Sequence, residues 1–413
     1  MSLKVDSSTT PKGLDNVGAT CYMNAVLQCF YHVKPLSAEL INYNFPQNMG
    51  FQIPMTFAYL DVVRQLSDNK GSSAKPIAFK NAINVNPLFT GIQANDSKDL
   101  ILYFLERIDQ ELTFINYITQ NKFIYNTMRL YNAFYGNPEL QSIFNVFVTN
   151  HKSIFSDLFY GFMSQTITCT KCKKKLTNYQ IFNFIIFPIE NVYNSKSNRN
   201  KISKEKEKDN YISKSISPYN MRPAGKPSMT SNSVYGNFYG EQQNNDYRKK
   251  INQSYGYSSN NNNFGGKNSV TLIDCFDNEI DDINFQGDNQ IYCNNCRKLL
   301  DASGKNKIFS TPHVLILILN RGKANKFECD VEFEEELDIK KYVESEKCPT
   351  KFKLIGVISH FGESSMSGHF IADCLHFNNK WYCFNDGIVT GPSYNYAKRG
   401  TPYILFYENI AHF

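Results

Sequence analysis

The order of two hydrophobic patterns is the feature that most constrains the fold of this chain. In the N-terminal part, residues 21–31 are apolar on most faces, and residues 99–112 (DLILYFLERIDQEL) repeat apolar residues at steps of three and four, which predicts core helices. The C-terminal part instead carries strand-like runs: Val314–Leu319, Phe352–His360, His369–Phe377, Lys380–Phe384 and Tyr403–Glu408. Helices first and strands later predict an α+β protein.

A low-complexity segment separates the two patterns. Residues 191–270 contain 16 Asn and no sustained apolar period, so we expect a disordered insertion. This segment has 13 Lys or Arg and 5 Asp or Glu, which gives it a net charge of +8. Because the whole chain has a net charge of +6, the rest of the chain carries about −2. One interpretation of this segment is a mobile surface loop with no function of its own. The other is a tail that binds a partner protein or nucleic acid.

Length and cysteine content constrain the domain organisation and the cellular compartment of the protein. With 413 residues, we expect two subdomains or one elaborated domain. No apolar run suits a signal peptide or a bilayer span, so we expect a soluble intracellular protein, cytoplasmic first and nuclear second, without a membrane partner. In a reducing compartment the 11 cysteines are thiols or metal ligands rather than disulfides.

Cys21 is the candidate nucleophile. It follows a Gly-containing loop, residues 16–20, and begins a helix-forming run. Orphan backbone N–H groups and the positive end of a helix lower the pKa of a thiol there, which favours the reactive thiolate. The same groups, with the amide of Asn16, could hold the oxyanion of a tetrahedral intermediate. A buried helical cysteine is more often a small hydrophobe, so this assignment needs a histidine partner.

His369 is the candidate partner of that thiol. It opens a strand directly after Gly368, whose missing side chain leaves room for the backbone of a substrate. A hairpin that turns near residues 378–379 would place Asn385 or Asp386 beside His369. A group that accepts from the far imidazole nitrogen fixes the tautomer, so that the near nitrogen faces the thiol. Taken alone, His369 could equally be a structural histidine.

Two Cys-x-x-Cys pairs predict a metal site. Cys169 and Cys172 form one pair, and Cys293 and Cys296 form the other, each near strand-like sequence. Four thiolates suit a tetrahedral zinc in a zinc ribbon, a closed site that is structural rather than catalytic. The alternatives are two unrelated pairs without metal and a redox Cys-x-x-Cys. We therefore expect one structural Zn²⁺ and no cofactor for catalysis.

Several motifs together resemble the ubiquitin-specific proteases. The segment GLDNVGATCYMNAVLQ is similar to their cysteine box, and GHFIAD with WYCFND is similar to their histidine box. Between them, ANDSKDLILYFLERI resembles the acidic helix motif, LFYGFMSQTITCTKC the start of the zinc fingers, and PHVLILILNR the strand before the palm. The order and spacing also agree, and the resemblance runs from about Gly13 to Glu408 except in the insertion.

The resemblance implies a papain-like hand with a helical thumb, a β-sheet palm and zinc-ribbon fingers. After a tail at residues 1–11, the catalytic domain would span 12–408, with the thumb at about 12–130, the fingers at about 159–187 and 271–311, the palm at about 312–408, and the insertion within the fingers. The fingers would hold the globular body of ubiquitin.

The resemblance also assigns roles to individual residues. Cys21 would be the nucleophile and His369 the general base and then acid. Asn385 would orient His369 with Asp386 beside it, and Asn16 would donate to the oxyanion.

Substrate contacts are expected at Asp96, Gly368 and Phe370. Asp96 matches the acidic position that meets a basic residue of the ubiquitin tail in relatives, and the slightly acidic body of this chain suits that tail. Phe370 stands where most relatives have Tyr, and Asp99 stands where they have Glu, so tail contacts differ in detail.

The resemblance implies a cysteine protease that hydrolyses the peptide or isopeptide bond after the C-terminal Gly of ubiquitin through an acyl-enzyme. We expect ubiquitin and ubiquitinated proteins as partners, no nucleic-acid partner, and a monomer. The alternatives are a non-catalytic zinc-ribbon module that binds ubiquitin or nucleic acid, a protease for another ubiquitin-like modifier, and a general peptide protease, which zinc fingers built for a folded substrate disfavour.

Overall fold

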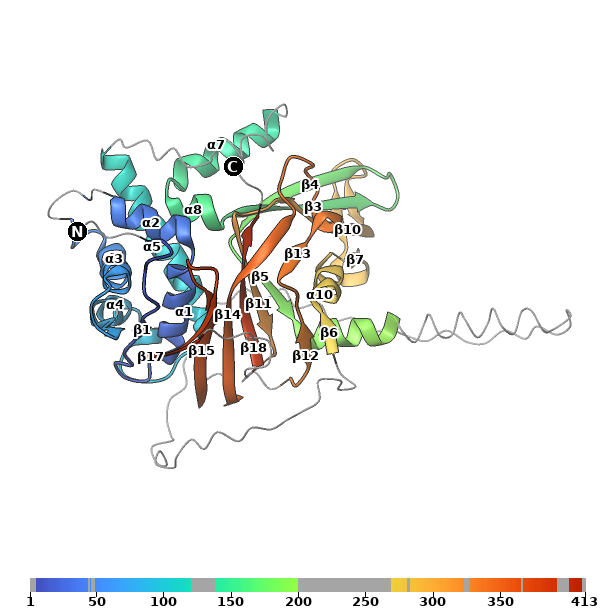
Figure 1. Cartoon of the computed structure of the whole chain (residues 1–413). Helices are drawn as coiled ribbons and strands as arrows, with labels where there is room; N and C mark the ends of the chain where they lie inside the picture. The colour runs from blue at the N-terminus through green and yellow to red at the C-terminus, as the bar shows by residue number, and fades with distance from the viewer. Residues whose placement is uncertain are drawn as a thin grey trace, which may run out of the picture. The chain divides into compact units, whose positions relative to one another are not determined.

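The structure is a computed structural model that describes residues 5–43, 45, 49–119, 138–199, 269–280, 283–322, 327–364, 367–391 and 401–410. The chain divides into two units, residues 1–197 with 268–413, and residues 198–267. Only residues 198–199 of the second unit are described, and the elements below all belong to the first unit (Figure 1). Most of the predicted insertion, residues 200–268, lies outside the described residues.

The N-terminal part is helical, as predicted. Its elements are α1 (Cys21–Tyr31), α2 (Lys34–Asn42), α3 (Pro54–Ser67), α4 (Ile77–Ile83), the 3₁₀ turn Pro87–Phe89, α5 (Ser97–Thr119), α7 (Pro138–Asn150) and α8 (Ile154–Phe159). Every residue of α1 is buried, which explains why its sequence is apolar on most faces. Figure 1 shows α1 between the other N-terminal helices and the strands β14 and β15, both of which it contacts.

The C-terminal part forms an eight-stranded sheet. Its strand order is β17-β16-β15-β14-β18-β11-β5, with β13 paired to β14 off this path. The strands are β5 (Ile185–Pro188), β11 (Val314–Asn320), β13 (Glu336–Asp338), β14 (Lys351–Ser364), β15 (Ser367–Leu375), β16 (Trp381–Asn385), β17 (Ile388–Thr390) and β18 (Thr401–Asn409). All neighbours are antiparallel except β5 and β11. Every strand-like run expected from the sequence lies in this sheet, so the α+β prediction is confirmed.

Both faces of the sheet are covered. On β11, Val314, Ile316 and Ile318 belong to the core cluster shared with the N-terminal helices. The alternate residues Leu315, Leu317 and Leu319 belong to a second cluster that includes α10 (Leu272–Glu279). Because successive side chains of a strand point to opposite faces, a strand buried on both sides needs the continuous apolar run VLILIL.

A smaller four-stranded sheet carries one cysteine pair, and a separate hairpin carries the other. The order of this sheet is β4-β3-β10-β7, built from β3 (Gly161–Cys169), β4 (Lys175–Phe182), β7 (Ile283–Phe285) and β10 (Ala302–Ser310). The hairpin joins β8 (Ile291–Cys293) and β9 (Lys298–Leu300). Strand β3 pairs with β10 from Phe162 to Cys169, which brings together segments that lie on either side of the insertion.

The prediction that residues 191–270 are disordered is wrong at both ends of that range. Residues 189–199 are helical, and Ser269–Thr271 form β6, which runs parallel to β12 (Asp330–Glu332). Val192 and Val270 are fully buried in the second core cluster. The isolated apolar residues at these ends pack on a core made by other segments, which low-complexity composition alone does not reveal.

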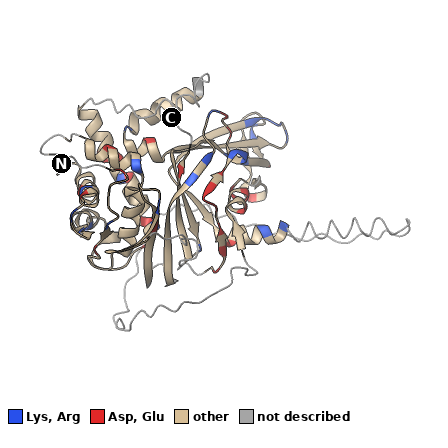
Figure 2. Cartoon of the chain, viewed as in Figure 1, with Lys and Arg blue, Asp and Glu red and all other residues tan. Residues whose placement is uncertain are grey.

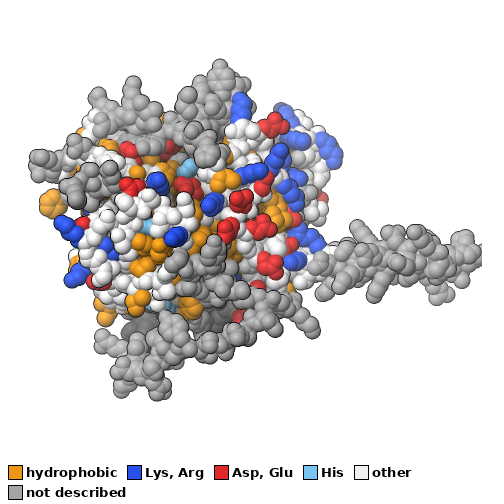
Figure 3. Space-filling view, in the orientation of Figure 1, with side chains coloured by type: hydrophobic (Ala, Val, Ile, Leu, Met, Phe, Trp, Pro, Cys, Tyr) orange, Lys and Arg blue, Asp and Glu red, His pale blue; other side chains and the backbone are white. Residues whose placement is uncertain are grey.

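Most charged side chains lie at the surface of the folded unit, whereas Asp109, Glu111 and Asp373 are buried. The strands of the large sheet are mostly free of charged side chains (Figure 2). Acidic side chains gather over β12 and β13 (Figure 3), where Glu332, Glu334, Glu336 and Asp338 are exposed. Among the described helices, none has both the length and the apolar character needed to cross a bilayer.

Candidate active site and metal centre

Cys21 lies in the first turn of α1, where backbone N–H groups have no partner within the helix. The Oδ1 atom of Asn16 orders the preceding loop by accepting from the backbone N–H of Gly18 and of Thr20, each at 3.1 Å. The loop turns through left-handed backbone, with φ of 121° at Gly18 and 49° at Ala19. The Cys21 side chain is 5% exposed, so the loop delivers a nearly buried thiol to the positive end of a helix.

His369 and Asn385 meet across the predicted hairpin. Strands β15 and β16 pair antiparallel around a turn in which Asn379 takes a φ of 61°. The Nε2 atom of His369 lies 2.6 Å from Oδ1 of Asn385. Since an amide oxygen only accepts, Nε2 carries the proton and Nδ1 is the nitrogen left for a thiol.

The electrostatics of His369 link it to Cys21. A hydrogen bond with the Cys21 side chain raises the pKa of His369 to about 9, against the opposing effect of burial, and the bond from Asn385 adds to the rise. The structure therefore brings Cys21, His369 and Asn385 together, although they lie on α1, β15 and β16.

Asp386 contacts the helix that begins at Cys21 and the loop before it. Its Oδ1 accepts from Nδ2 of Asn24 at 2.7 Å, and its Oδ2 accepts from Nδ2 of Asn16 at 2.9 Å. Its backbone oxygen accepts from the N–H of Leu14 at 2.9 Å. The sequence leaves open whether Asn385 or Asp386 orients His369; in the structure Asn385 contacts the histidine and Asp386 contacts the thumb helix and its loop.

The amide of Asn16 retains donor capacity. Its side chain is exposed, its Oδ1 is engaged by the loop, and one N–H of its Nδ2 serves Asp386. An amide nitrogen carries two N–H donors, so the second stays available for a ligand oxygen near the start of α1.

Asp96 contacts the sheet rather than the thiol and imidazole of the site. Its Oδ2 accepts from the Tyr403 hydroxyl of β18 at 2.9 Å, and its Oδ1 accepts from the backbone N–H of Lys98 at 2.8 Å. Burial raises the pKa of Asp96, and these hydrogen bonds oppose that rise. A carboxylate can accept further bonds, so Asp96 can still take a cationic side chain.

Of the two remaining expected substrate contacts, Gly368 stays a prediction and Phe370 needs correction. A Cβ on Gly368 would lie 2.3 Å from Nε2 of His360 and 2.6 Å from the backbone oxygen of Phe361, so the glycine accommodates the chain's own side chain and backbone. Phe370 is 2% exposed and packs against His360 at 4.7 Å and Tyr403 at 6.0 Å between ring centroids. Phe370 belongs to the core, because it follows His369 on a strand and therefore points to the opposite face.

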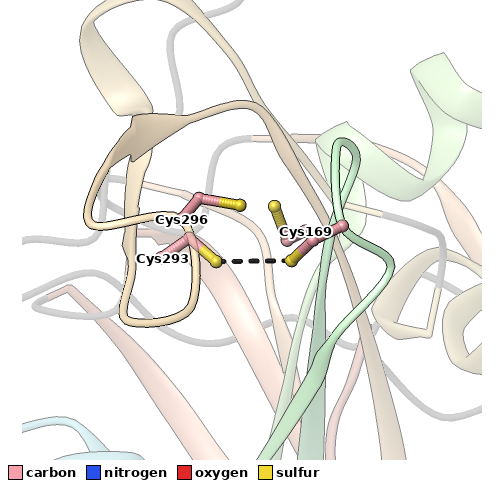
Figure 4. Close-up of side chains that lie close together, drawn as sticks. Cys169, Cys293 and Cys296 are labelled. Carbon is pink, nitrogen blue, oxygen red and sulfur yellow. Dashed lines mark hydrogen bonds between the residues drawn. The ribbon is translucent and has the colours of Figure 1, made fainter.

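The four predicted metal ligands form one cluster. The sulfur atoms of Cys169, Cys172, Cys293 and Cys296 all lie within 4.8 Å of one another, and Cys172 and Cys293 are 3.6 Å apart. Tetrahedral zinc with Zn–S bonds of about 2.3 Å requires sulfur separations of about 3.8 Å, whereas a disulfide requires about 2.05 Å. The donor set therefore fits a structural zinc. Figure 4 shows Cys169 facing Cys293 and Cys296 across the centre.

The two cysteine pairs adopt matching turns. After each pair comes a residue with left-handed backbone, Lys173 at φ 59° and Arg297 at φ 54°. The N–H of Lys173 donates to the oxygen of Cys169 at 3.0 Å, and that of Arg297 donates to the oxygen of Cys293 at 2.7 Å. Two turns of the same form that aim four thiols at one point are what a zinc ribbon needs.

Sequence reasoning missed Asn24 and Tyr403. Asn24 is a buried polar residue in an otherwise apolar stretch of α1, and such residues are hydrogen-bonded, so the helix pattern held the signal. Tyr403 lies in a strand-like run, and nothing in the sequence points to its bond with Asp96.

Comparison with known proteins identifies the family. The sequence model of the family "Ubiquitin carboxyl-terminal hydrolase" matches residues 12–407. The chain is 22% identical to human ubiquitin carboxyl-terminal hydrolase 21 over 96% of this chain and 61% of that protein. It is 26% identical to rat ubiquitin carboxyl-terminal hydrolase 15 over 43% of this chain and 19% of that protein. The chain thus spans less than two thirds of these curated relatives.

Solved structures share the fold. The SAGA DUB module Ubp8/Sgf11/Sus1/Sgf73 bound to monoubiquitin matches with a TM-score of 0.64 at 19% identity, over 100% of this chain and 72% of the matched chain. The same module bound to ubiquitin aldehyde matches with a TM-score of 0.60 at 18% identity, over 100% and 71% of the two chains. Together with the family match along the chain, these likenesses show that the chain belongs to the ubiquitin carboxyl-terminal hydrolase family, as a ubiquitin-specific protease.

Proposed function

We propose that this chain is a thiol-dependent hydrolase that cleaves the peptide or isopeptide bond after the C-terminal Gly of ubiquitin. The observation that carries the proposal is the meeting of Cys21, His369 and Asn385, with the pKa of His369 raised to about 9 by its bond to the thiol. Family membership supports ubiquitin as the substrate, and both matched solved structures are bound to ubiquitin or ubiquitin aldehyde.

In this mechanism the Cys21 thiolate attacks the carbonyl carbon of ubiquitin's C-terminal Gly. The free N–H of the Asn16 amide and the unpaired N–H groups of the first turn of α1 donate to the oxyanion. His369 then gives its proton to the leaving amine, which leaves an acyl-enzyme on Cys21. Neutral His369 next takes a proton from the water that attacks the thioester, and the bond to Cys21 breaks to release ubiquitin's C-terminal carboxylate and the thiolate. Asn385 keeps the imidazole oriented throughout.

Binding and chemistry are separated in the fold. Asp96 takes a basic side chain of ubiquitin's tail, and the four-stranded sheet with its hairpin forms the fingers that hold ubiquitin's body. A zinc bound by Cys169, Cys172, Cys293 and Cys296 would cross-link the two halves of the fingers and take no part in hydrolysis. The protein acts on folded ubiquitin rather than on general peptides.

The test uses ubiquitin that carries a C-terminal electrophile, with the product read by intact mass. We expect a covalent adduct with the wild-type chain, none with Cys21→Ala, and none with a short-peptide electrophile. Adduct formation that survives Cys21→Ala would refute the nucleophile. A folded, zinc-loaded protein that reacts only with another ubiquitin-like modifier would refute ubiquitin as the substrate, and one that reacts with no modifier would indicate a binding module.

A further inference from the structure

A buried pair of histidines joins the two elements that carry the proposed nucleophile and base. His32 is the C-terminal cap of α1, and His376 directly follows β15. The Nε2 atom of His32 lies 3.0 Å from Nδ1 of His376. The two side chains are 3% and 2% exposed. Neither takes part in the proposed mechanism.

The outer nitrogens of the pair each face a backbone carbonyl. The Nδ1 atom of His32 lies 2.8 Å from the oxygen of Gln28 in the last turn of α1. The Nε2 atom of His376 lies 2.8 Å from the oxygen of Thr9 in the N-terminal segment. Carbonyl oxygens only accept hydrogen bonds, so each outer nitrogen must carry a proton.

The number of N–H protons on the four imidazole nitrogens determines the charge of the pair. Two neutral imidazoles carry two N–H protons in total, and both are used by the carbonyls. The inner nitrogens would then face each other with lone pairs at 3.0 Å, which is repulsive rather than bonding. A third proton between the rings turns this contact into a hydrogen bond.

We propose that His32 and His376 form an imidazole–imidazolium pair that holds one extra proton and thereby positions α1 against β15. This role rests on the proposed function, because it concerns the elements that carry Cys21 and His369. The pair is a positioning device and touches neither the substrate nor the reacting atoms.

The surroundings suit a single buried cation. Four aromatic rings lie around the two imidazoles, with centroid distances of 4.9–5.6 Å: Tyr31, Phe377, Tyr382 and Phe384. Aromatic faces attract cations, more strongly where water is excluded. The negative end of the α1 dipole lies at His32, which adds to this attraction.

Other charged groups near the pair point elsewhere. The ammonium of Lys12 bonds the backbone oxygens of Gln65, Asp68 and Lys70. Lys380, in the turn after His376, is exposed. Asp373 of β15 occupies the strand face opposite to Cys374, whose thiol meets Cys29 of α1 at 3.9 Å. Among the residues that the structure describes, the titratable groups whose rings pack against the two imidazoles are Tyr31 and Tyr382.

Burial limits the pair to one charge at most. Desolvation lowers the pKa of both histidines, and repulsion from His376 also lowers that of His32, to about 3. These shifts oppose the first added proton as well as the second, so the case for the shared proton rests on the two carbonyl contacts and on the 3.0 Å contact between the rings. The two rings share one proton, and its titration belongs to the pair rather than to either residue.

The proton count is measured without any need for activity. Side-chain ¹H–¹⁵N spectra are recorded on ¹⁵N-histidine-labelled Cys21→Ala protein from about pH 6 to pH 8.5. At pH 8.5 an ordinary histidine with a pKa of about 6.5 is almost wholly neutral. We expect three N–H protons on the pair across this range, one of them shared and far downfield. Two singly protonated neutral rings throughout would overturn the proposal.

Two variants complete the test. In His376→Asn an uncharged amide N–H replaces the shared proton as the donor to His32, so the shared-proton signal should disappear. The control is His313→Gln, which should leave that signal unchanged, because His313 contacts Glu408 at 3.3 Å. In the Cys21-intact chain we expect His376→Asn to lower kcat several-fold while KM for a ubiquitin substrate stays within about twofold. An unchanged kcat in His376→Asn would refute the positioning role of the pair. A Cys21-intact chain without activity would refute the proposed function, but the NMR result on the number of protons would still hold.

Discussion

The Oδ1 atom of Asp386 lies 2.7 Å from Nδ2 of Asn24, so a carboxylate that follows the palm hairpin holds the first turn of the helix that begins at Cys21. Its second oxygen holds Asn16 in the loop before that helix at 2.9 Å. One side chain therefore fixes both parts of the chain that flank Cys21, whereas its neighbour Asn385 fixes His369.

Asp386→Asn should show whether the contacts of Asp386 with Asn16 and Asn24 position Cys21 for activity or only stabilise the fold. An amide offers one acceptor where the carboxylate offers two, so its NH₂ group must face a second NH₂ group on Asn16 or Asn24. A hydrogen bond to a charged group contributes about 1.5–3 kcal/mol, which corresponds to a fall of roughly 10- to 100-fold in kcat/KM. The comparison is Asp288→Asn, an exposed site in the 3₁₀ turn Gly287–Asn289. Equal kcat/KM in both variants would show that the clamp does not position Cys21.

The pKa of His369 should depend on Cys21. The side-chain bond with Cys21 is the largest cause of its rise to about 9, so Cys21→Ala should return this pKa toward 6.5 in a histidine NMR titration. Asn385→Ala should lower it less, because that bond is a smaller cause. A pKa near 9 that persists in Cys21→Ala would show that the thiol and imidazole are not coupled.

The same shift predicts the pH dependence of activity and stability. Because the folded-state pKa of His369 is raised, its stabilising contribution is fully present below about pH 6.5 and is lost as pH rises through about 9. In the proposed mechanism the imidazolium is also the proton donor to the leaving amine, so kcat/KM should fall on an alkaline limb near pH 9. Unfolding midpoints and kcat/KM measured from pH 6 to pH 10 check both, and a profile flat to pH 10 would contradict the assignment.

Gly368→Ala should destabilise the fold by crowding His360. The new Cβ would lie 2.3 Å from the ring and 2.6 Å from a backbone oxygen, and overpacking of this kind costs about 1–3 kcal/mol. Gly50→Ala is the matched control, because no atom lies within 4 Å of its added Cβ. Adding His360→Ala to Gly368→Ala should recover part of the loss in a denaturant titration. No recovery would mean that the backbone oxygen of Phe361, not the ring, sets the cost.

The sequence could predict those site residues that lie in a recognisable local pattern, such as a helix start or a hairpin. Cys21 is marked by a loop before a helix, and His369 and Asn385 by a hairpin with recognisable turn residues. The long-range contacts of Asp386 with Asn24 and of Asp96 with Tyr403 depend on how the helices pack on the sheet, which no local pattern specifies. The substrate contact expected at Phe370 is wrong, although strand alternation, applied to His369, already places its neighbour in the core.

The zinc site gives the sharpest test of the fingers. Cys293→Ser removes one thiolate from the four, and since metal affinity in such a site is folding free energy, we expect bound zinc to fall from about one per chain and the thermal midpoint to drop. Cys329→Ser, outside the cluster, should keep the zinc. The centre carries no chemistry for hydrolysis, so alkylation of Cys21 by a small reagent should persist in Cys293→Ser while kcat/KM for ubiquitin falls. Zinc content that is unchanged in Cys293→Ser, or a thermal midpoint that a strong chelator does not shift, would refute a structural zinc in this ribbon.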